Sequence, residues 1–141
     1  MTRLIISIVI LFCTASFVQA GNAAGNAGEC KRETLQTAVD SYLAAQKKGD
    51  LSKALLADRV KYIENLTEVK KDKGIWNTPL AVDFDRSFLD VDACRTFTEV
   101  IAAKGDNPYV IGTRLTVEGG RISEIDSMVT KKDDWLFNAV D

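Results

Sequence analysis

The spacing of apolar residues between positions 30 and 49 predicts an amphipathic helix. They recur at intervals of three and four, which places them along one stripe of a helix. The stripe consists of Leu35, Ala38, Val39, Tyr42 and Leu43. Gly49 follows, and a glycine adopts the left-handed conformation that often closes a helix. Asp50 or Ser52 can cap one or two further helical turns in "DLSKALLA".

From Val60 onward the apolar period shortens to two, which predicts strands. The segment "VKYIEN" places Val60, Tyr62 and Glu64 on one side of a short strand. "LAVDFDRSFLDVDA" predicts a short strand or an extended segment ending in a turn, and "ACRTFTEVIA" predicts a further strand. Helices followed by a run of strands predict an α+β domain, with helices packed on one side of a curved antiparallel sheet.

Residues 109–126 predict a hairpin with Gly119-Gly120 as its two-residue loop. Strict pairing from that loop places Leu115 opposite Glu124, Thr113 opposite Asp126, and Ile111 opposite Met128. These six residues then share the more apolar face, and Arg114 lies on the wetter one. An acid on an apolar face suits proton transfer. The alternatives are that Glu124 is simply exposed and that Asp126 bonds Thr113.

The first twenty residues have the three-part pattern of a secretory signal peptide: Arg3, an apolar run, and small residues up to Ala20. The alternative, a membrane anchor, is disfavoured because the apolar run is shorter than the roughly 20 residues that span a bilayer. We expect a secreted protein with no membrane contact after cleavage. Residues 21–29 predict a flexible lead-in, and residues 30–141 one domain.

The remaining cysteines, Cys30 and Cys94, predict a disulfide in an oxidising compartment; two unpaired thiols are the alternative. Without histidine, two cysteines do not predict a zinc site, so we expect no metal. Asn65-Leu66-Thr67 is an acceptor sequence for N-glycosylation. The formal charge of −2 gives no basic surface for nucleic acid.

Several segments together resemble a family of secreted fungal domains of unknown function, in the SnoaL-like branch of the nuclear-transport-factor-2-like superfamily. They are "YLAAQKKGDLSKAL", "VKYIEN", "CRTFTEVIA", "NPYVIGTRLTVEGGRISEID" and "DWLFNA". The resemblance implies a cone-shaped SnoaL-like domain, with N-terminal helices on a curved sheet and a pocket at its wide end. Many members of that family are longer, which implies a second half of the same fold.

The resemblance to isomerases of this superfamily is by region, and it places the base at Glu64 or Asn65 and the oxyanion-binding tyrosine at Tyr42. In an enzyme built on this fold, Glu64 or Asp126 would move the proton, and Tyr42 or Tyr62 would stabilise the oxyanion. The His-dependent cyclase mechanism does not carry over, because the chain has no histidine. We expect no cofactor. Residues expected to line a ligand pocket are Tyr62, Thr113, Arg114 and Met128.

The sequence therefore favours a secreted module that binds a small apolar molecule or a partner protein. The partner would be a second copy of the chain or a second SnoaL-like half. The alternative is a cofactor-independent isomerase or cyclase that uses a carboxylate base. A cystatin-like inhibitor is disfavoured, since "YVIG" supplies only part of the inhibitory loop and lies within a strand.

Overall fold

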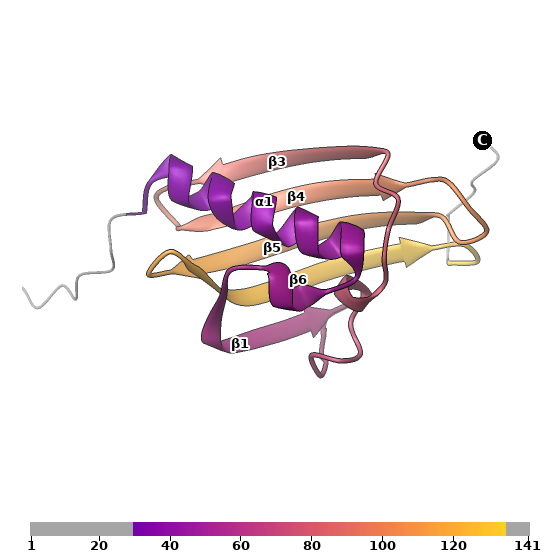
Figure 1. The fold of residues 1–141 in the computed structure, drawn as a ribbon, viewed down its shortest axis with the longest axis horizontal. Helices are drawn as coiled ribbons and strands as arrows, with labels where there is room; N and C mark the ends of the chain where they lie inside the picture. Colours follow the sequence, from indigo (N-terminus) through magenta and orange to yellow (C-terminus); the bar gives the residue numbers. More distant parts are fainter. Residues whose placement is uncertain (1–29, 135–141) are drawn as a thin grey trace, which may run out of the picture.

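One α-helix lies across a curved six-stranded sheet (Figure 1). The computed structural model describes residues 30–134. The predicted signal peptide, the lead-in and the apolar segment after Asp134 lie outside these residues. In chain order the elements are α1 (Arg32–Lys48), η1 (Leu51–Lys53), β1 (Leu56–Glu64), β2 (Thr67–Glu68), η2 (Ile75–Asn77), β3 (Phe84–Asp90), β4 (Arg95–Ala102), β5 (Tyr109–Glu118) and β6 (Arg121–Lys131).

The predicted helix is confirmed. Its apolar stripe is buried against the sheet, from Leu35 at 0% exposure to Leu43 at 7%. Gly49 closes it with a φ of 63°, and its N–H donates to backbone carbonyls of the last turn. Burying one such stripe stabilises the domain more than helix propensity does, because an isolated helix of this length is marginal in water.

The predicted second helix is only a 3₁₀ turn. Asp50 caps it, as one of the two predicted candidates, with its carboxylate accepting from the Ser52 N–H at 3.1 Å. The chain becomes extended at Leu56, so the end of "DLSKALLA" is strand rather than helix. Strand pairing determines the conformation of this segment, because Leu56 pairs with Ile122 of β6. The prediction of more than one N-terminal α-helix is therefore wrong.

The sheet has the order β2-β1-β6-β5-β4-β3 and is mixed rather than wholly antiparallel. Strand β1 runs parallel to β6, with Tyr62 beside Ile125 and Glu64 beside Ser127. The other pairings, β1 with β2 and those from β6 through β3, are antiparallel. The first strand of the domain therefore lies next to the last one in the sheet.

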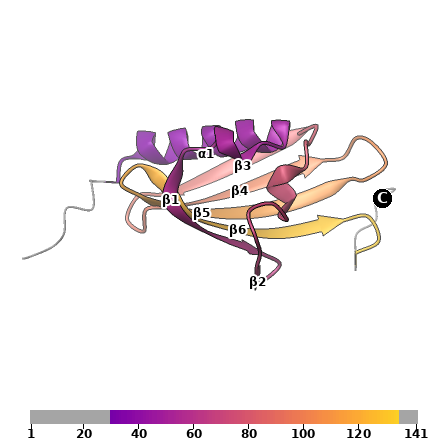
Figure 2. The ribbon, with the colours of Figure 1, turned by 60° about the horizontal axis from the view of Figure 1, so that its bottom comes forward.

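The core lies between α1 and the sheet face that it covers, which we call the inner face. Besides the helix stripe it contains Trp76, Ile111, Leu115, Ile122 and Ile125, each less than 2% exposed. The opposite side, which we call the outer face, has no helix over it among residues 30–134 (Figure 2). Within the same residues, no helix is long and apolar enough to cross a membrane.

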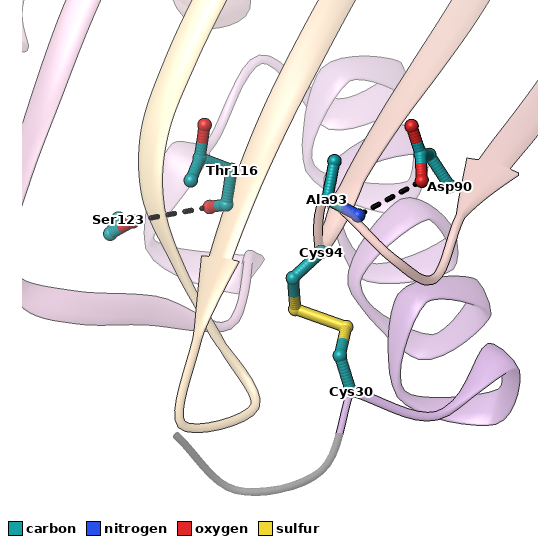
Figure 3. The surroundings of a disulfide bond; sticks show 6 residues. All are labelled: Cys30, Asp90, Ala93, Cys94, Thr116 and Ser123. Carbon is teal, nitrogen blue, oxygen red and sulfur yellow. Dashed lines mark hydrogen bonds between the residues drawn. A yellow bond between two sulfur atoms is a disulfide. The ribbon is translucent and has the colours of Figure 1, made fainter. Parts of the chain in front are cut away.

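The structure contains the predicted Cys30–Cys94 disulfide (Figure 3). It joins the residue just before α1 to the turn between β3 and β4. In that turn the Ala93 N–H donates to the Asp90 carboxylate at 2.9 Å. A cross-link with a sequence separation of 64 residues therefore fixes one end of the helix to the sheet.

Candidate functional site

A chain of buried hydroxyl groups links the helix to the two central strands. The Tyr42 hydroxyl lies 3.2 Å from Thr113 Oγ1, which lies 3.0 Å from Ser127 Oγ. The Gln46 side chain accepts from Tyr42 at 3.5 Å and donates to the carbonyls of Ile75 and Thr78. Burial raises the pKa of Tyr42, which keeps its hydroxyl neutral.

Glu64 points to the same inner side, at the end of β1, and its carboxylate is already bonded. Oε2 accepts from the Ile75 N–H at 2.7 Å, at the start of η2. The neighbouring Tyr62 packs its ring on Trp76, with the centroids 5.1 Å apart, and burial raises the pKa of Tyr62. The indole N–H of Trp76 donates to the Lys71 carbonyl at 2.9 Å, so this tryptophan closes the core rather than forming a partner surface.

The structure thus brings four of the predicted residues to the inner side of the sheet: Tyr42, Tyr62, Glu64 and Thr113. They form a packed polar cluster, with Tyr42 1% and Thr113 0% exposed. The Tyr42 and Thr113 hydroxyls bond to each other, and the Glu64 carboxylate bonds to the Ile75 N–H. A substrate would have to displace these bonds to reach them.

The prediction that Glu124 and Asp126 share the apolar face of the hairpin is wrong. The pairs nearest the loop are as predicted: Glu118 lies opposite Arg121, and Val117 opposite Ile122. The register then shifts by one residue, because β6 contains Ser123 as an extra residue of a β-bulge. A one-residue slip moves the following side chains to the other face.

The acids therefore lie on the outer face beside Arg114. Its guanidinium Nη2 donates to Asp126 Oδ2 at 2.8 Å and to Glu124 Oε1 at 3.3 Å. Lys61 Nζ, from β1, lies 3.8 Å from the other oxygen of Glu124. Met128 follows on the same face and is 52% exposed. Asp126 and Glu64 thus lie on opposite sides of the sheet and cannot act in one pocket.

The outer face carries apolar side chains that the sequence analysis did not single out. Phe84, Phe88 and Phe97 are 45%, 55% and 47% exposed, and Leu66 is 83% exposed. Phe88 and Phe97 are cross-strand partners of β3 and β4. The alternation in "RTFTEV" was the sequence signal for the outward position of Phe97. Thr96 and Thr98 are buried, and successive side chains of a strand point to opposite faces.

Two hollows share Phe97 and Arg114 in their lining, and we call the two together the aromatic trough. One, of 340 Å³, lies between Phe88, Arg95 and Arg114. The other, of 220 Å³, lies over Gly112 between Leu66 and Met128. Gly112 leaves room for the Phe97 ring, because a Cβ atom would meet the tip of that ring at 3.0 Å.

Two wider depressions adjoin the trough at Arg95. One, of 520 Å³, is lined by charged residues of β1, β2 and β6, and the other, of 850 Å³, lies beside the disulfide. Within residues 30–134, no three Cys, Asp or Glu side chains are grouped so as to hold a metal ion. Asp90, one of the acids of β3, accepts a hydrogen bond from the Ala93 N–H of the following turn.

No family model matches the chain, and no curated protein matches it. Solved structures with a similar arrangement include a protein described as "Putative Isomerase" from Rhodopseudomonas palustris, with 9% identity and a TM-score of 0.48, over 68% of this chain and 88% of that one. Another is an NTF-2 like protein of unknown function from Burkholderia xenovorans LB400, with 12% identity and a TM-score of 0.49, over 75% and 88% of the two chains.

Proposed function

We propose that this chain is an exported binding domain of the NTF2-like superfamily, and that it recognises its ligand through the outer face of its sheet. One observation carries the proposal: on the inner side the Tyr42, Thr113 and Ser127 hydroxyls are bonded to one another and Glu64 to the backbone, whereas the exposed aromatic residues and the two hollows beside Phe97 lie on the outer face. Exposed apolar patches of this kind mark binding surfaces. The disulfide agrees with an oxidising, extracellular location.

The alternative function is a carboxylate-base isomerase or cyclase. In its favour, Glu64 and Tyr42, the residues that the family resemblance suggests, lie on one side of the sheet. However, the Glu64 carboxylate accepts from the Ile75 N–H at 2.7 Å. Asp126, the other candidate base, is held by Arg114 on the opposite side. Binding therefore accounts for more of the arrangement than catalysis does.

The two faces can be distinguished by NMR. A naphthalene sulfonate dye, which has both an apolar body and an acidic group, is titrated into isotope-labelled protein. We expect amide shifts in β3 to β6 at residues that point outward, such as Phe97 and Met128. Shifts confined to the neighbourhood of Tyr42 and Glu64 would instead indicate an inner pocket and overturn the proposal.

Catalysis is tested separately by incubation with small enolisable ketones in D₂O, with deuterium uptake followed by NMR. The proposal expects no acceleration beyond that given by the matched variant Glu64→Gln. Exchange catalysed by the wild-type chain and abolished in that variant would establish the isomerase alternative.

A second copy of the chain, or a second half of the same fold, is the alternative occupant of the outer face. The charges there are largely paired within the face: Arg86 with Glu99 at 2.8 Å, and Arg114 with Asp126 at 2.8 Å. Another copy could cover these pairs without isolating a charge, but it would have to supply a partner for Arg95. Sedimentation equilibrium tests this directly.

A further inference from the structure

We propose that the outer face binds an amphipathic carboxylate: a single acid group on a linear apolar chain. The acid group would bind Arg95, and the chain would lie in the trough across Phe97. This inference rests on the proposed function, because it names the ligand of the same face. Three features of the face lead to it, and the first is the state of Arg95.

The charge of Arg95 is unpaired within residues 30–134. Three other arginines have partners: Arg86 binds Glu99, Arg114 binds Asp126, and Arg121 donates to the Leu56 carbonyl. Arg59 has no such partner within the same residues, but it borders only the charged depression and not the trough. Within residues 30–134 the Arg95 side chain has no ion pair and no hydrogen bond. A guanidinium fork matches a carboxylate in shape and charge.

The position of Arg95 decides where the acid group would lie. It borders the trough and both wider depressions. The depression towards β1 also contains Glu68, Glu118 and Glu124, which would repel an anion. On the trough side the acids are Asp90, whose carboxylate accepts from the Ala93 N–H, and Asp126, which is paired with Arg114. An anion on Arg95 is therefore favoured on the side of the trough.

The trough itself suits a linear chain. It runs from Phe88 past Phe97 and over Gly112 to Met128 and Leu66, across strands β3 to β6. Its middle is flanked by Arg114, whose charge is already neutralised by Asp126 and Glu124. From Arg95 to Met128 the register gives about four residues along the strands and two strands across, which is roughly 16 Å. An extended ten-carbon acid covers most of that length.

The test uses decanoate and, as a ligand without charge, decanol, both below their solubility limits. Binding is followed by NMR and calorimetry on the disulfide-intact chain. We expect decanoate to shift the signals of Phe88, Phe97 and Met128 and to bind about tenfold more tightly than decanol, as for a hydrogen bond to a charged group. Arg95→Gln should remove that tenfold preference.

Two further variants make the test specific. Arg59→Gln removes another exposed arginine, which borders the charged depression but not the trough, and should change decanoate binding less than twofold. Gly112→Ala fills the hollow under Phe97 and should weaken both ligands alike. Thermal unfolding of each variant confirms that it is folded.

Each outcome has a definite meaning. Equal binding of decanoate and decanol, or equal losses in Arg95→Gln and Arg59→Gln, overturns the assignment of the acid group to Arg95. If neither ligand binds, this inference is overturned, while the dye titration decides separately whether the outer face is the binding surface. If decanoate shifts Thr113 and Ser127 instead, both this inference and the proposed function fail.

Discussion

The side chain of Asn65 hydrogen-bonds the turn after β1 to the last strand. Removing this contact should measurably destabilise the domain. Asn65 and Leu66 form the turn between β1 and β2, with φ of 49° and 65°. Asn65 Oδ1 accepts from the Val129 N–H at 2.8 Å, and Nδ2 donates to the Val129 carbonyl at 3.2 Å. The amide thus continues the pairing of β1 with β6 for one more residue.

Asn65→Asp isolates the donor half of this contact. Aspartate tolerates the left-handed conformation and keeps the acceptor oxygen, but it replaces the N–H donor by a carboxylate oxygen. The lost hydrogen bond and the new contact between two acceptors should lower the free energy of unfolding by about 1–2 kcal/mol. For a domain of this size, about 1 kcal/mol corresponds to about 4–8 °C in Tm.

The matched control is Thr67→Val. It destroys the same glycosylation sequence but lies outside the Asn65–Val129 contact, and valine suits a strand equally well. Urea unfolding at pH 7 should show a loss for Asn65→Asp and a change below about 0.5 kcal/mol for Thr67→Val. Equal stabilities of the two variants would refute the stabilising role of the Asn65 amide.

The same geometry has a consequence for the predicted glycosylation of Asn65. The hydrogen that faces Val129 lies on the same side of the amide as Oδ1, because both contact one residue. A sugar on a trans secondary amide replaces that hydrogen. We therefore predict that a glycosylated chain loses this donor, and that it unfolds at a lower urea concentration than the chain carrying no sugar.

Further predictions concern the core, the cross-link and one loop. Tyr42→Phe should cost about 1–2 kcal/mol at neutral pH through the lost contact with Thr113. Because burial raises the Tyr42 pKa, its contribution is lost as the pH rises above about 10, so the variant should show a weaker alkaline loss of stability in pH-dependent unfolding. Replacing Cys30 and Cys94 together by serine should lower the urea-derived stability by up to about 4 kcal/mol. The Lys104 side chain, 2.7 Å from Asp83, lowers the Asp83 pKa, so this stabilisation is lost as the pH falls below about 4; Asp83→Asn should flatten the acid limb of the stability curve.

Features with a local cause could be predicted from the sequence. The helix was predictable because its apolar stripe has the helical period, and its end because Gly49 follows two lysines. The hairpin loop was predictable because two consecutive glycines favour such a loop, and Gly119 and Gly120 do adopt positive φ, at 57° and 79°. These arrangements depend on residues close together in the chain.

The bulge at Ser123 was harder to predict, although a signal exists. Ile122 and Ile125 are both fully buried, and their spacing of three breaks the period of two that a regular strand requires. Reading that break as an extra residue would have placed Glu124 and Asp126 on the outer face. The strict alternation assumed instead put them on the wrong side.

The order of the strands, and whether the polar groups on the inner side are free to bind a substrate, depend on residues that are distant in sequence. No local pattern in β1 identifies β6 as its parallel neighbour. Likewise, Tyr42 and Glu64 lie on one side of the sheet, as the family resemblance implied. Their bonds to Thr113 and to the Ile75 N–H come from other elements, so the sequence did not reveal that both groups are already occupied.

The parallel pairing of β1 with β6 also affects how the chain can be made. Leu56 pairs with Ile122, so β1 has only the two residues of β2 as a partner until nearly the whole domain has been synthesised. Long-range pairing of this kind forms slowly, because loop closure precedes any gain from contacts. A nascent chain that ends before β6 leaves the edges of both β1 and β5 open to other strands.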